Sequence, residues 1–309
     1  MKTQEMAALG RPVPNVVLGM MRIRNLDDTA VRALVRTALD EGVDYFDHAD
    51  IYGGETHGCE RRFAEAVALT PSERERIVLQ TKCGIVRDGP YYDFSYEHIM
   101  SSVEGSLRAL RTDYVDVLLL HRPDALVEPD EVARAFADLE SGGKVRAFGV
   151  SNHTPRQIEL LRASVAQPIA VNQLRLSLAH ASIVAQGLAS NMPGLDQSVS
   201  VDGGGVLDYC RRNGITVQAW SPFQSPTGVF LGSPSYPELN AAIERIAAAH
   251  GVPPVAVATA WITRHPARMQ VVVGTTTPAR VSAAAQGSAL PLTRPEWYDL
   301  FRAAGHHIP

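Results

Sequence analysis

Apolar residues follow two alternating spacings along the chain. Over residues 31–39 they recur at every third or fourth position, as on one face of a helix, and residues 43–47 then form a short run typical of a strand. The same order repeats as far as residue 273, for example in the β-branched run 77–82 and the almost continuously apolar run 115–120. An apolar run of that kind suits a strand buried on both faces, as in a parallel sheet.

Capping residues mark the starts of several predicted helices. Asp27 or Asp28 precedes the first helix, and Ser95 precedes another. The segment Thr154-Pro155-Arg156-Gln157 forms a capping box with proline at the first helical position, and Thr293 with Glu296 repeats the box near the C-terminus. The apolar runs are therefore separated by helices.

Eight strands alternate with helices in this pattern. Eight such units in one chain predict a closed (β/α)8 TIM barrel, with the catalytic face at the C-terminal strand ends. We expect a single domain over residues 1–309, with a long loop near residues 178–205 and a short C-terminal tail. A doubly wound open sheet is the alternative, disfavoured because no Gly-x-Gly-x-x-Gly turn follows the first strand. The predicted strands lie near Val16–Leu18 and end near Asp47, Lys82, His121, Ser151, Gln173, Trp220 and Val273.

Composition narrows the class of protein further. Hydrophobic residues make up 45% and charged residues 20% of the 309 residues, which is typical of a globular protein. The net charge of −4 disfavours a nucleic-acid or anionic-membrane surface. No apolar run reaches the ~18 residues needed to cross a bilayer, and the first residues do not resemble a secretory signal, so we expect a cytoplasmic protein. The three cysteines are far apart and lack metal-binding spacing, so neither a disulfide framework nor a metal site is expected.

Polar residues stand where the predicted strands end. Asp47 ends the second strand and Tyr52 follows five residues later, while Lys82 ends the third strand and His121 the fourth. Each alone could be structural, as a barrel ion pair, a packed ring or a core histidine. Because the C-terminal strand ends of a barrel meet at one mouth, their coincidence favours a site that carries chemistry.

Several segments resemble the motifs of the aldo-keto reductase family. They occur in the family's order and extend from about Val17 to Thr293, nearly the whole chain. The matching segments are Phe46-Asp47-His48-Ala49-Asp50-Ile51-Tyr52-Gly53, Gln80-Thr81-Lys82, Leu118-Leu119-Leu120-His121-Arg122-Pro123, Gly149-Val150-Ser151-Asn152, and Gly274-Thr275-Thr276 with Arg280.

The resemblance implies reversible reduction of a carbonyl group by a nicotinamide cofactor. In that assignment Tyr52 donates the proton, Lys82 lowers the pKa of Tyr52, Asp47 holds Lys82 by an ion pair, and His121 orients the carbonyl. A free tyrosine has a pKa of about 10, and a neighbouring ammonium lowers it. A catalytic acid works best when its pKa moves toward the operating pH.

The resemblance also assigns the cofactor to this face. Ser151, Asn152 and Gln173 would hold the nicotinamide carboxamide, and Trp220 would stack on the nicotinamide ring. The remaining candidates are Ser221 and Phe223 near the pyrophosphate, and Gly274, Thr275, Thr276 and Arg280 at the adenosine end.

Arg280 predicts NADPH/NADP+ as the cofactor rather than NADH. A cation in the first turn of a helix opposes the helix dipole, so Arg280 is better explained as a ligand for an anion such as the 2′-phosphate. Two positions depart from the family pattern. Gly274 stands where many members have lysine, and Ala284 stands where a polar contact to adenine is common.

The expected partner is a small-molecule carbonyl substrate, with no nucleic acid and no membrane. Met21, His48, Tyr91 and Tyr92 follow the first three strands and are candidates for the substrate pocket. An apolar cover over the barrel is the alternative interpretation of the residues after the first and third strands, and His48 could instead only fill space.

Two functions from different classes fit these residues. The first is an NADP-dependent aldehyde or ketone reductase, and the second is a regulatory or sensor subunit that binds NADPH on the same barrel. The complete set of Asp47, Tyr52, Lys82 and His121 favours the enzyme. A barrel lyase or isomerase would need metal or phosphate ligands that we do not find in the sequence.

Overall fold

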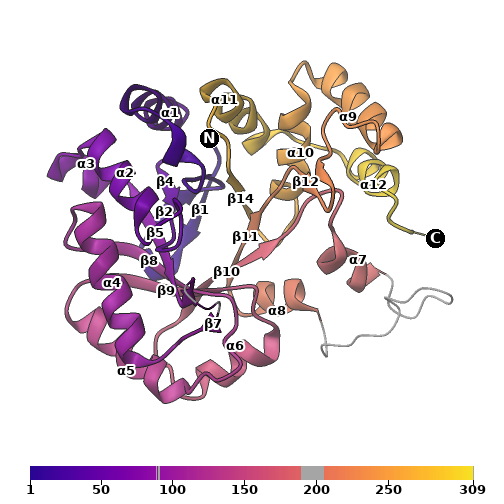
Figure 1. Ribbon diagram of the computed structural model, residues 1–309. Helices are drawn as coiled ribbons and strands as arrows, with labels where there is room; N and C mark the ends of the chain where they lie inside the picture. Colours follow the sequence, from indigo (N-terminus) through magenta and orange to yellow (C-terminus); the bar gives the residue numbers. More distant parts are fainter. Residues whose placement is uncertain (88, 90, 189–204, 309) are drawn as a thin grey trace.

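Eight parallel strands close into a barrel in a computed structural model that describes residues 1–87, 89, 91–188 and 205–308 (Figure 1). The strand order around the barrel is β10-β11-β14-β3-β4-β5-β8-β9, which confirms the predicted (β/α)8 fold. All eight predicted strands are present. They are β3 (Val16–Gly19), β4 (Tyr45–Asp47), β5 (Val78–Cys83), β8 (Val115–His121), β9 (Val145–Ser151), β10 (Ile169–Arg175), β11 (Thr216–Trp220) and β14 (Gln270–Val273).

Helices surround the barrel and cover its outer face (Figure 1). Those that precede residue 189 are α1 (Asp28–Asp40), α2 (Gly58–Val67), α3 (Pro71–Arg76), α4 (Tyr96–Leu110), α5 (Pro129–Ser141), α6 (Pro155–Arg162) and α7 (Ser182–Leu188). Those C-terminal to it are α8 (Val206–Arg212), α9 (Pro237–His250), α10 (Pro254–Thr263), α11 (Pro278–Gln286) and α12 (Arg294–Ala303).

The predicted helix caps are present. Asp27 accepts a hydrogen bond from the amide of Ala30, and Ser95 accepts one from the amide of His98. Thr154 and Thr293 form capping boxes with the glutamine or glutamate three residues later. Within the predicted long loop near residues 178–205, the structure contains α7, while residues 189–204 of that loop lie outside the described residues.

Successive side chains on a strand point to opposite sides, so every second residue faces the barrel interior. In β5, Val78 belongs to the interior cluster, whereas Leu79 and Cys83 pack in the layer between the barrel and the helices. Gln80 and Lys82 share the face of Val78, so they point into the barrel. By the same rule Tyr45 and Asp47 of β4 point inward, and Phe46 and His48 point outward.

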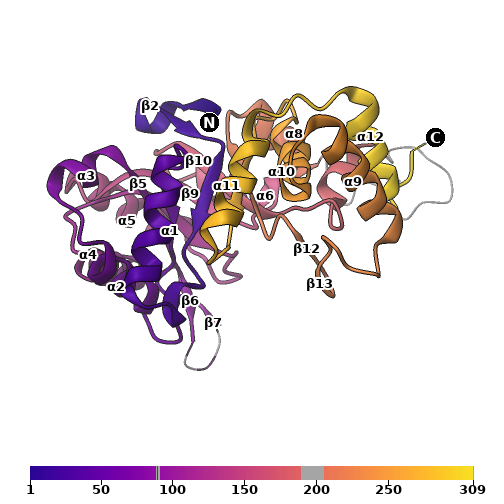
Figure 2. The ribbon, with the colours of Figure 1, turned by 90° about the horizontal axis from the view of Figure 1, so that it is seen from above.

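Three hairpins cap the two ends of the barrel. The hairpin of β1 (Thr3–Met6) and β2 (Arg11–Pro14) lies at one end, where Met6 and Val13 pack on the interior cluster. At the other end lie β6 (Ile85–Val86) with β7 (Tyr91–Tyr92), and β12 (Gln224–Ser225) with β13 (Gly228–Val229) (Figure 2). The sequence pattern did not predict the hairpins. The two at the C-terminal strand ends do not close that end of the barrel, which stays an open mouth.

No helix among the described residues is, on its own, both long and apolar enough to cross a bilayer. Helices α9 and α10 pass that test of length and composition only when taken together, and the chain bends by 94° between them.

Candidate active site

A cavity of about 830 Å³ opens at the C-terminal ends of the barrel strands. That volume suits a drug-sized or cofactor-sized ligand. The cavity reaches from Asp47, Tyr52 and His121 at one end to Arg280 at the other. The other predicted residues that line it are Ser151, Asn152, Gln173, Trp220, Ser221, Phe223, Gly274, Thr275 and Thr276.

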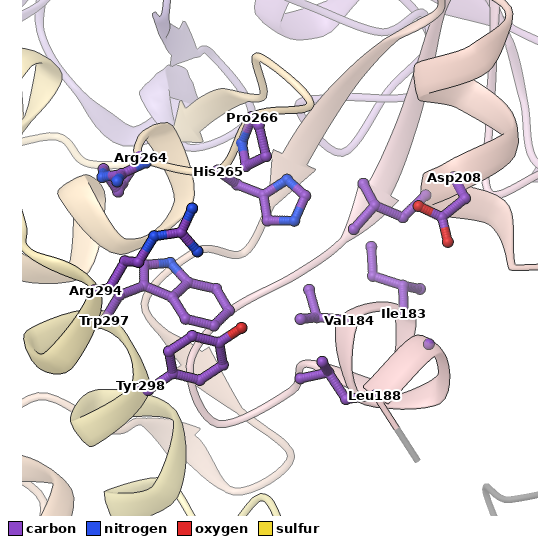
Figure 3. Close-up of a pocket in the computed structure, with 12 residues that line it drawn as sticks. Ile183, Val184, Leu188, Asp208, Arg264, His265, Pro266, Arg294, Trp297 and Tyr298 are labelled. Carbon is purple, nitrogen blue, oxygen red and sulfur yellow. The ribbon is translucent and has the colours of Figure 1, made fainter. Parts of the chain in front are cut away.

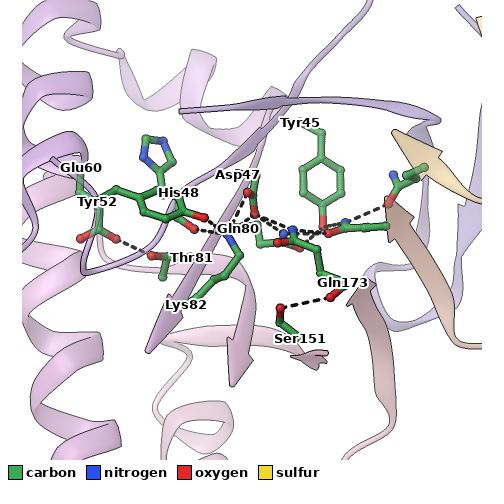
Figure 4. Close-up of polar contacts among 12 residues, drawn as sticks. Tyr45, Asp47, His48, Tyr52, Glu60, Gln80, Thr81, Lys82, Ser151 and Gln173 are labelled. Carbon is green, nitrogen blue, oxygen red and sulfur yellow. Dashed lines mark hydrogen bonds and ion pairs between the residues drawn. The ribbon is translucent and has the colours of Figure 1, made fainter. Parts of the chain in front are cut away.

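Lys82 is fully buried and contacts two predicted residues that line the cavity, Asp47 and Tyr52 (Figure 4). Its Nζ lies 2.7 and 2.8 Å from the two carboxylate oxygens of Asp47 and 3.2 Å from the hydroxyl of Tyr52. A third hydrogen bond of 2.7 Å goes to the carbonyl oxygen of His48. An ammonium carries three protons, so acceptors from three residues hold it in one position.

Burial and the charges around Lys82 determine the pKa values of Lys82 and Tyr52. Burial acts to lower the pKa of Lys82, but the Asp47 carboxylate and the neighbouring Tyr52 outweigh it and raise that pKa above its ordinary value of 10.5. Burial raises the pKa of Tyr52 above its ordinary value of 10.0, against the lowering effect of the Lys82 ammonium. The Lys82 ammonium therefore acts in the predicted direction on the pKa of this phenol, but burial is the larger influence and the net shift is upward.

His121 faces Tyr52 across the cavity. The two rings are edge to face, with centroids 6.0 Å apart and planes at 85°. Burial, together with the positive charges of Lys82 and Arg122, lowers the pKa of His121 well below its ordinary value of 6.5. The ring is therefore neutral at pH 7, with one nitrogen that donates and one that accepts. Within the described part of the chain, its buried Nδ1 has no hydrogen-bond partner.

A second buried network holds the loop that carries Tyr52. Glu60 of α2 is fully buried and accepts a hydrogen bond of 2.5 Å from the hydroxyl of Thr81 (Figure 4). A second contact of 2.6 Å joins Glu60 to Nδ1 of His57. The carbonyl of Tyr52 accepts a hydrogen bond of 2.9 Å from the amide of Cys59. Gly53 has φ of 108°, and a Cβ there would lie 2.6 Å from the amide nitrogen of Cys59, so only glycine fits this turn.

Side chains on three neighbouring strands form one chain of hydrogen bonds along the cavity wall. Nε1 of Trp220 donates to Oδ1 of Asn152 at 3.1 Å. Nδ2 of Asn152 donates to the hydroxyl of Ser151 at 2.8 Å, and that hydroxyl donates to the backbone carbonyl of Gln173 at 3.1 Å. Asn152 has φ of 59°, a left-handed conformation that asparagine tolerates. These four predicted residues are therefore fixed relative to one another.

Arg280 lies at the far end of the cavity. It is an exposed residue in the first turn of α11 and forms no ion pair with another described residue. Its guanidinium is thus available to an anion in the cavity. The helix begins at Pro278 after Thr277, whose side chain does not cap it; Pro278 has no amide hydrogen, and the amide of Arg280 donates to the carbonyl of Thr277 at 3.0 Å.

The predicted substrate-pocket residues divide between the cavity and other places. Met21 lines the cavity. His48 is fully buried and packs edge-on against Phe63, with the ring centroids 4.9 Å apart. Since His48 follows the inward-facing Asp47, its side chain points outward to the helix layer. Tyr91 and Tyr92 lie on β7, exposed and outside the cavity lining. His48 thus fits the alternative of a space-filling residue, whereas the substrate-pocket assignment of Tyr91 and Tyr92 differs from the structure.

Sequence reasoning missed two kinds of residue. The first is cationic, since Arg22 and Arg122 also line the cavity. The second is a set of buried glutamines below Lys82, which includes Gln80 and Gln218. A signal for the glutamines was present, because each is an amide within a predicted strand and directly follows an apolar residue, Leu79 or Val217.

A smaller cavity of about 390 Å³ lies away from the barrel mouth, between α7 and α8 on one side and α12 on the other (Figure 3). Ile183, Val184 and Leu188 face Trp297 and Tyr298 across it. None of the predicted site residues borders it, so the candidate site is the larger cavity.

Acidification is expected to destabilise the protein through its buried histidines. Burial lowers the pKa of both His48 and His153 to about 4. In the unfolded chain these groups take up protons below about pH 6.5, whereas in the folded protein they do so only near pH 4, so stability is lost as the pH falls through this window. Each histidine accounts for about 3 kcal/mol of this loss in the free energy of unfolding. Burial and the charge of Glu60 raise the pKa of Asp50 to about 7. The folded protein therefore takes up a proton on Asp50 before the unfolded chain does, which offsets part of the loss of stability as the pH falls.

The variant His48→Leu isolates one of these contributions. We expect the free energy of unfolding, measured by urea titration, to fall less between pH 7 and pH 4 in His48→Leu than in the wild type, by about 3 kcal/mol. Equal losses of stability in the two proteins over this window would contradict the assignment.

Comparisons with known proteins agree with this geometry. The aldo/keto reductase family model matches residues 15–303. The chain is 37% identical to an uncharacterized oxidoreductase, YcsN, of Bacillus subtilis and 35% identical to the 6-dehydroglucose reductase of Agrobacterium fabrum. These alignments cover 95% of both chains for the first and 94% of this chain and 93% of the relative for the second.

The fold comparison gives the same barrel fold. A solved thermostable aldo-keto reductase, in complex with the inhibitor epalrestat, superposes with a TM-score of 0.78 over 98% of this chain and 100% of that chain, at 23% identity. Together, the family match over nearly the whole chain, the related bacterial oxidoreductases and the closed barrel show that this chain belongs to the aldo-keto reductase family.

Proposed function

We propose that the protein reduces an aldehyde or ketone to an alcohol with NADPH, and that Tyr52 is the proton donor. The observation that carries the proposal is the Tyr52 hydroxyl, 3.2 Å from the Lys82 ammonium in a cavity that His121 also lines. Membership of a family of oxidoreductases supports carbonyl reduction as the chemistry.

The residues present fit a nicotinamide dinucleotide. The hydrogen-bonded set of Ser151, Asn152 and Gln173 offers amide and hydroxyl groups to a carboxamide, and Trp220 offers an aromatic face beside them. Nε2 of Gln173 already donates to Asp47 and Gln218, so its Oε1 is the atom left to accept from a ligand. Arg280 lies in the first turn of α11, at the other end of the cavity, where its guanidinium suits a phosphate.

The bound cofactor supplies the hydride that reaches the carbonyl carbon. The neutral His121 donates a hydrogen bond to the carbonyl oxygen and orients it, an effect of the oxyanion-hole type worth about 3–4 kcal/mol. The Tyr52 hydroxyl transfers its proton to that oxygen. Lys82 stabilises the phenolate left behind, and Asp47 keeps Lys82 charged and in place.

A substrate screen tests the reaction. Loss of reduced-nicotinamide absorbance is followed with NADPH and a panel of aldehydes and ketones, including 6-dehydroglucose because one relative is named for its reduction. We expect turnover with at least one carbonyl. NADPH binding without turnover across the panel would instead favour the regulatory or sensor function.

The cofactor preference depends on Arg280. We expect Arg280→Ala to weaken NADPH binding by about 10- to 100-fold, because hydrogen bonds to charged groups contribute about 1.5–3 kcal/mol. The affinity for NADH, which lacks the 2′-phosphate, is the internal control and should not change. Equal affinities of the wild type for NADPH and NADH would remove the phosphate-binding role from Arg280.

A further inference from the structure

A group of buried amides extends from Asp47, beside Lys82, across the barrel interior (Figure 4). Gln80, Gln218 and Gln270 are fully buried and Gln173 is 3% exposed. Gln80 lies on β5 and Gln218 on β11, four strands apart in the ring of eight, so their hydrogen bond spans the barrel. Because a buried amide costs free energy unless its donors and acceptors are paired, such a group constrains its own geometry.

The direction of these hydrogen bonds is set at the lower end by a backbone carbonyl, which can only accept. Nε2 of Gln270 donates to the carbonyl of Pro14 at 2.6 Å. Oε1 of Gln270 then accepts from Nε2 of Gln218 at 2.9 Å. Oε1 of Gln218 in turn accepts from Nε2 of Gln80 at 2.9 Å and from Nε2 of Gln173 at 3.0 Å.

The upper end is the carboxylate of Asp47, which also only accepts. Its Oδ1 receives hydrogen bonds of 2.5 Å from Gln80 and 3.0 Å from Gln173. Since an amide nitrogen has two hydrogens, Gln80 and Gln173 each donate one to Gln218 and the other to Asp47. Tyr45 fixes the orientation of Gln80, because its hydroxyl accepts from Gln218 at 3.2 Å and donates to Oε1 of Gln80 at 2.8 Å. Reversing the amide of Gln80 would place two acceptors in contact.

We propose that Gln80 and Gln218 are positioning residues, which hold Oδ1 of Asp47 so that the carboxylate keeps Lys82 beside the Tyr52 hydroxyl. Gln80 touches Asp47 directly, and Gln218 acts through Gln80 and Gln173. Two N–H donors on Oδ1 stabilise the ionised carboxylate and offset part of its charge. The effect expected on turnover rests on the proposed function, whereas the effect on Tyr52 ionisation does not.

The variant Gln80→Met tests the proposal, since methionine preserves the length of the side chain and removes the amide. We expect kcat for carbonyl reduction to fall by about tenfold, the loss that corresponds to one hydrogen bond to a charged group. We also expect the pH at which Tyr52 ionises to rise by roughly 0.5–1 pH unit, because the charge of Asp47 is less offset. Fluorine NMR of a ring-fluorinated tyrosine at position 52 reports that ionisation directly and requires no turnover.

Gln270→Met is the matched control. Gln270 is as fully buried as Gln80 and accepts a hydrogen bond from Gln218. It forms no hydrogen bond with Asp47, nor with Gln80 or Gln173, whose amides donate to Asp47. We expect Gln270→Met to lose stability while Tyr52 ionises at the wild-type pH. An unchanged ionisation of Tyr52 in Gln80→Met, or an equal shift in Gln270→Met, would overturn the proposal.

A second variant covers the case in which Gln80→Met does not fold. Gln218→Met removes the acceptor shared by Gln80 and Gln173, so the upward shift of Tyr52 ionisation is expected there too, and its absence would also overturn the proposal. If the wild type reduces no carbonyl at all, the proposed function fails, while the NMR comparison still decides whether the glutamines set the electrostatics at Tyr52.

Discussion

Tyr52→Phe is expected to lower kcat for carbonyl reduction by about 10²- to 10⁴-fold, the range that a positioned acid contributes. Phenylalanine keeps the ring that faces His121 but lacks the hydroxyl that lies 3.2 Å from Lys82. In the described part of the chain, no other hydroxyl forms a hydrogen bond with the Lys82 ammonium. The dissociation constant for NADPH, measured by fluorescence titration, should stay within about twofold, since the hydroxyl contributes chiefly to the transition state.

Tyr96→Phe provides the control for loss of a tyrosine hydroxyl. The hydroxyl of Tyr96 donates to Asp138 on the surface between α4 and α5, away from the cavity, so this variant should keep the wild-type kcat. Turnover by Tyr52→Phe at the rate of Tyr96→Phe would show that Tyr52 is not the proton donor.

Lys82→Met is expected to destabilise the fold and to abolish most turnover. The change leaves the buried carboxylate of Asp47 without its counter-ion, and breaking a buried pair in this way costs about 3–5 kcal/mol. It also removes the charge that stabilises the Tyr52 phenolate. Chemical denaturation measures the first effect, and steady-state reduction of the best carbonyl from the screen measures the second.

A double variant separates these two effects. In Asp47→Asn with Lys82→Met, no buried charge remains, and the asparagine oxygen can still accept from Gln80 and Gln173. We expect the double variant to be more stable than Lys82→Met alone and equally inactive. Wild-type stability in Lys82→Met would contradict the account of the ion pair.

The barrel could be predicted from the sequence because its eight strands are apolar runs separated by capped helices. The hairpin of β1 and β2 could not, since its strands have four residues each and β2 contains two prolines, which argue against a strand. The short hairpins β6–β7 and β12–β13 have two residues per strand, too few to show a period.

Which residues gather at the mouth could also be predicted, because they follow the strand ends. The net pKa of Tyr52 could not, since it depends on burial, which the sequence does not show. The position of His48 was available from the sequence, because a residue adjacent to inward-facing Asp47 must point outward. The glutamines needed the structure, since only the closed barrel brings β5 and β11 face to face.

The proton-donor role of Tyr52 is tested most directly by changing the acidity of its phenol alone. Ring-fluorinated tyrosines incorporated at position 52 lower the phenol pKa in steps while keeping its shape, and the rate of carbonyl reduction is then measured against pH. We predict that the pH above which reduction is lost falls in step with the pKa of the substituted phenol. An alkaline loss of activity that stays at the same pH in every fluorinated protein would contradict the account.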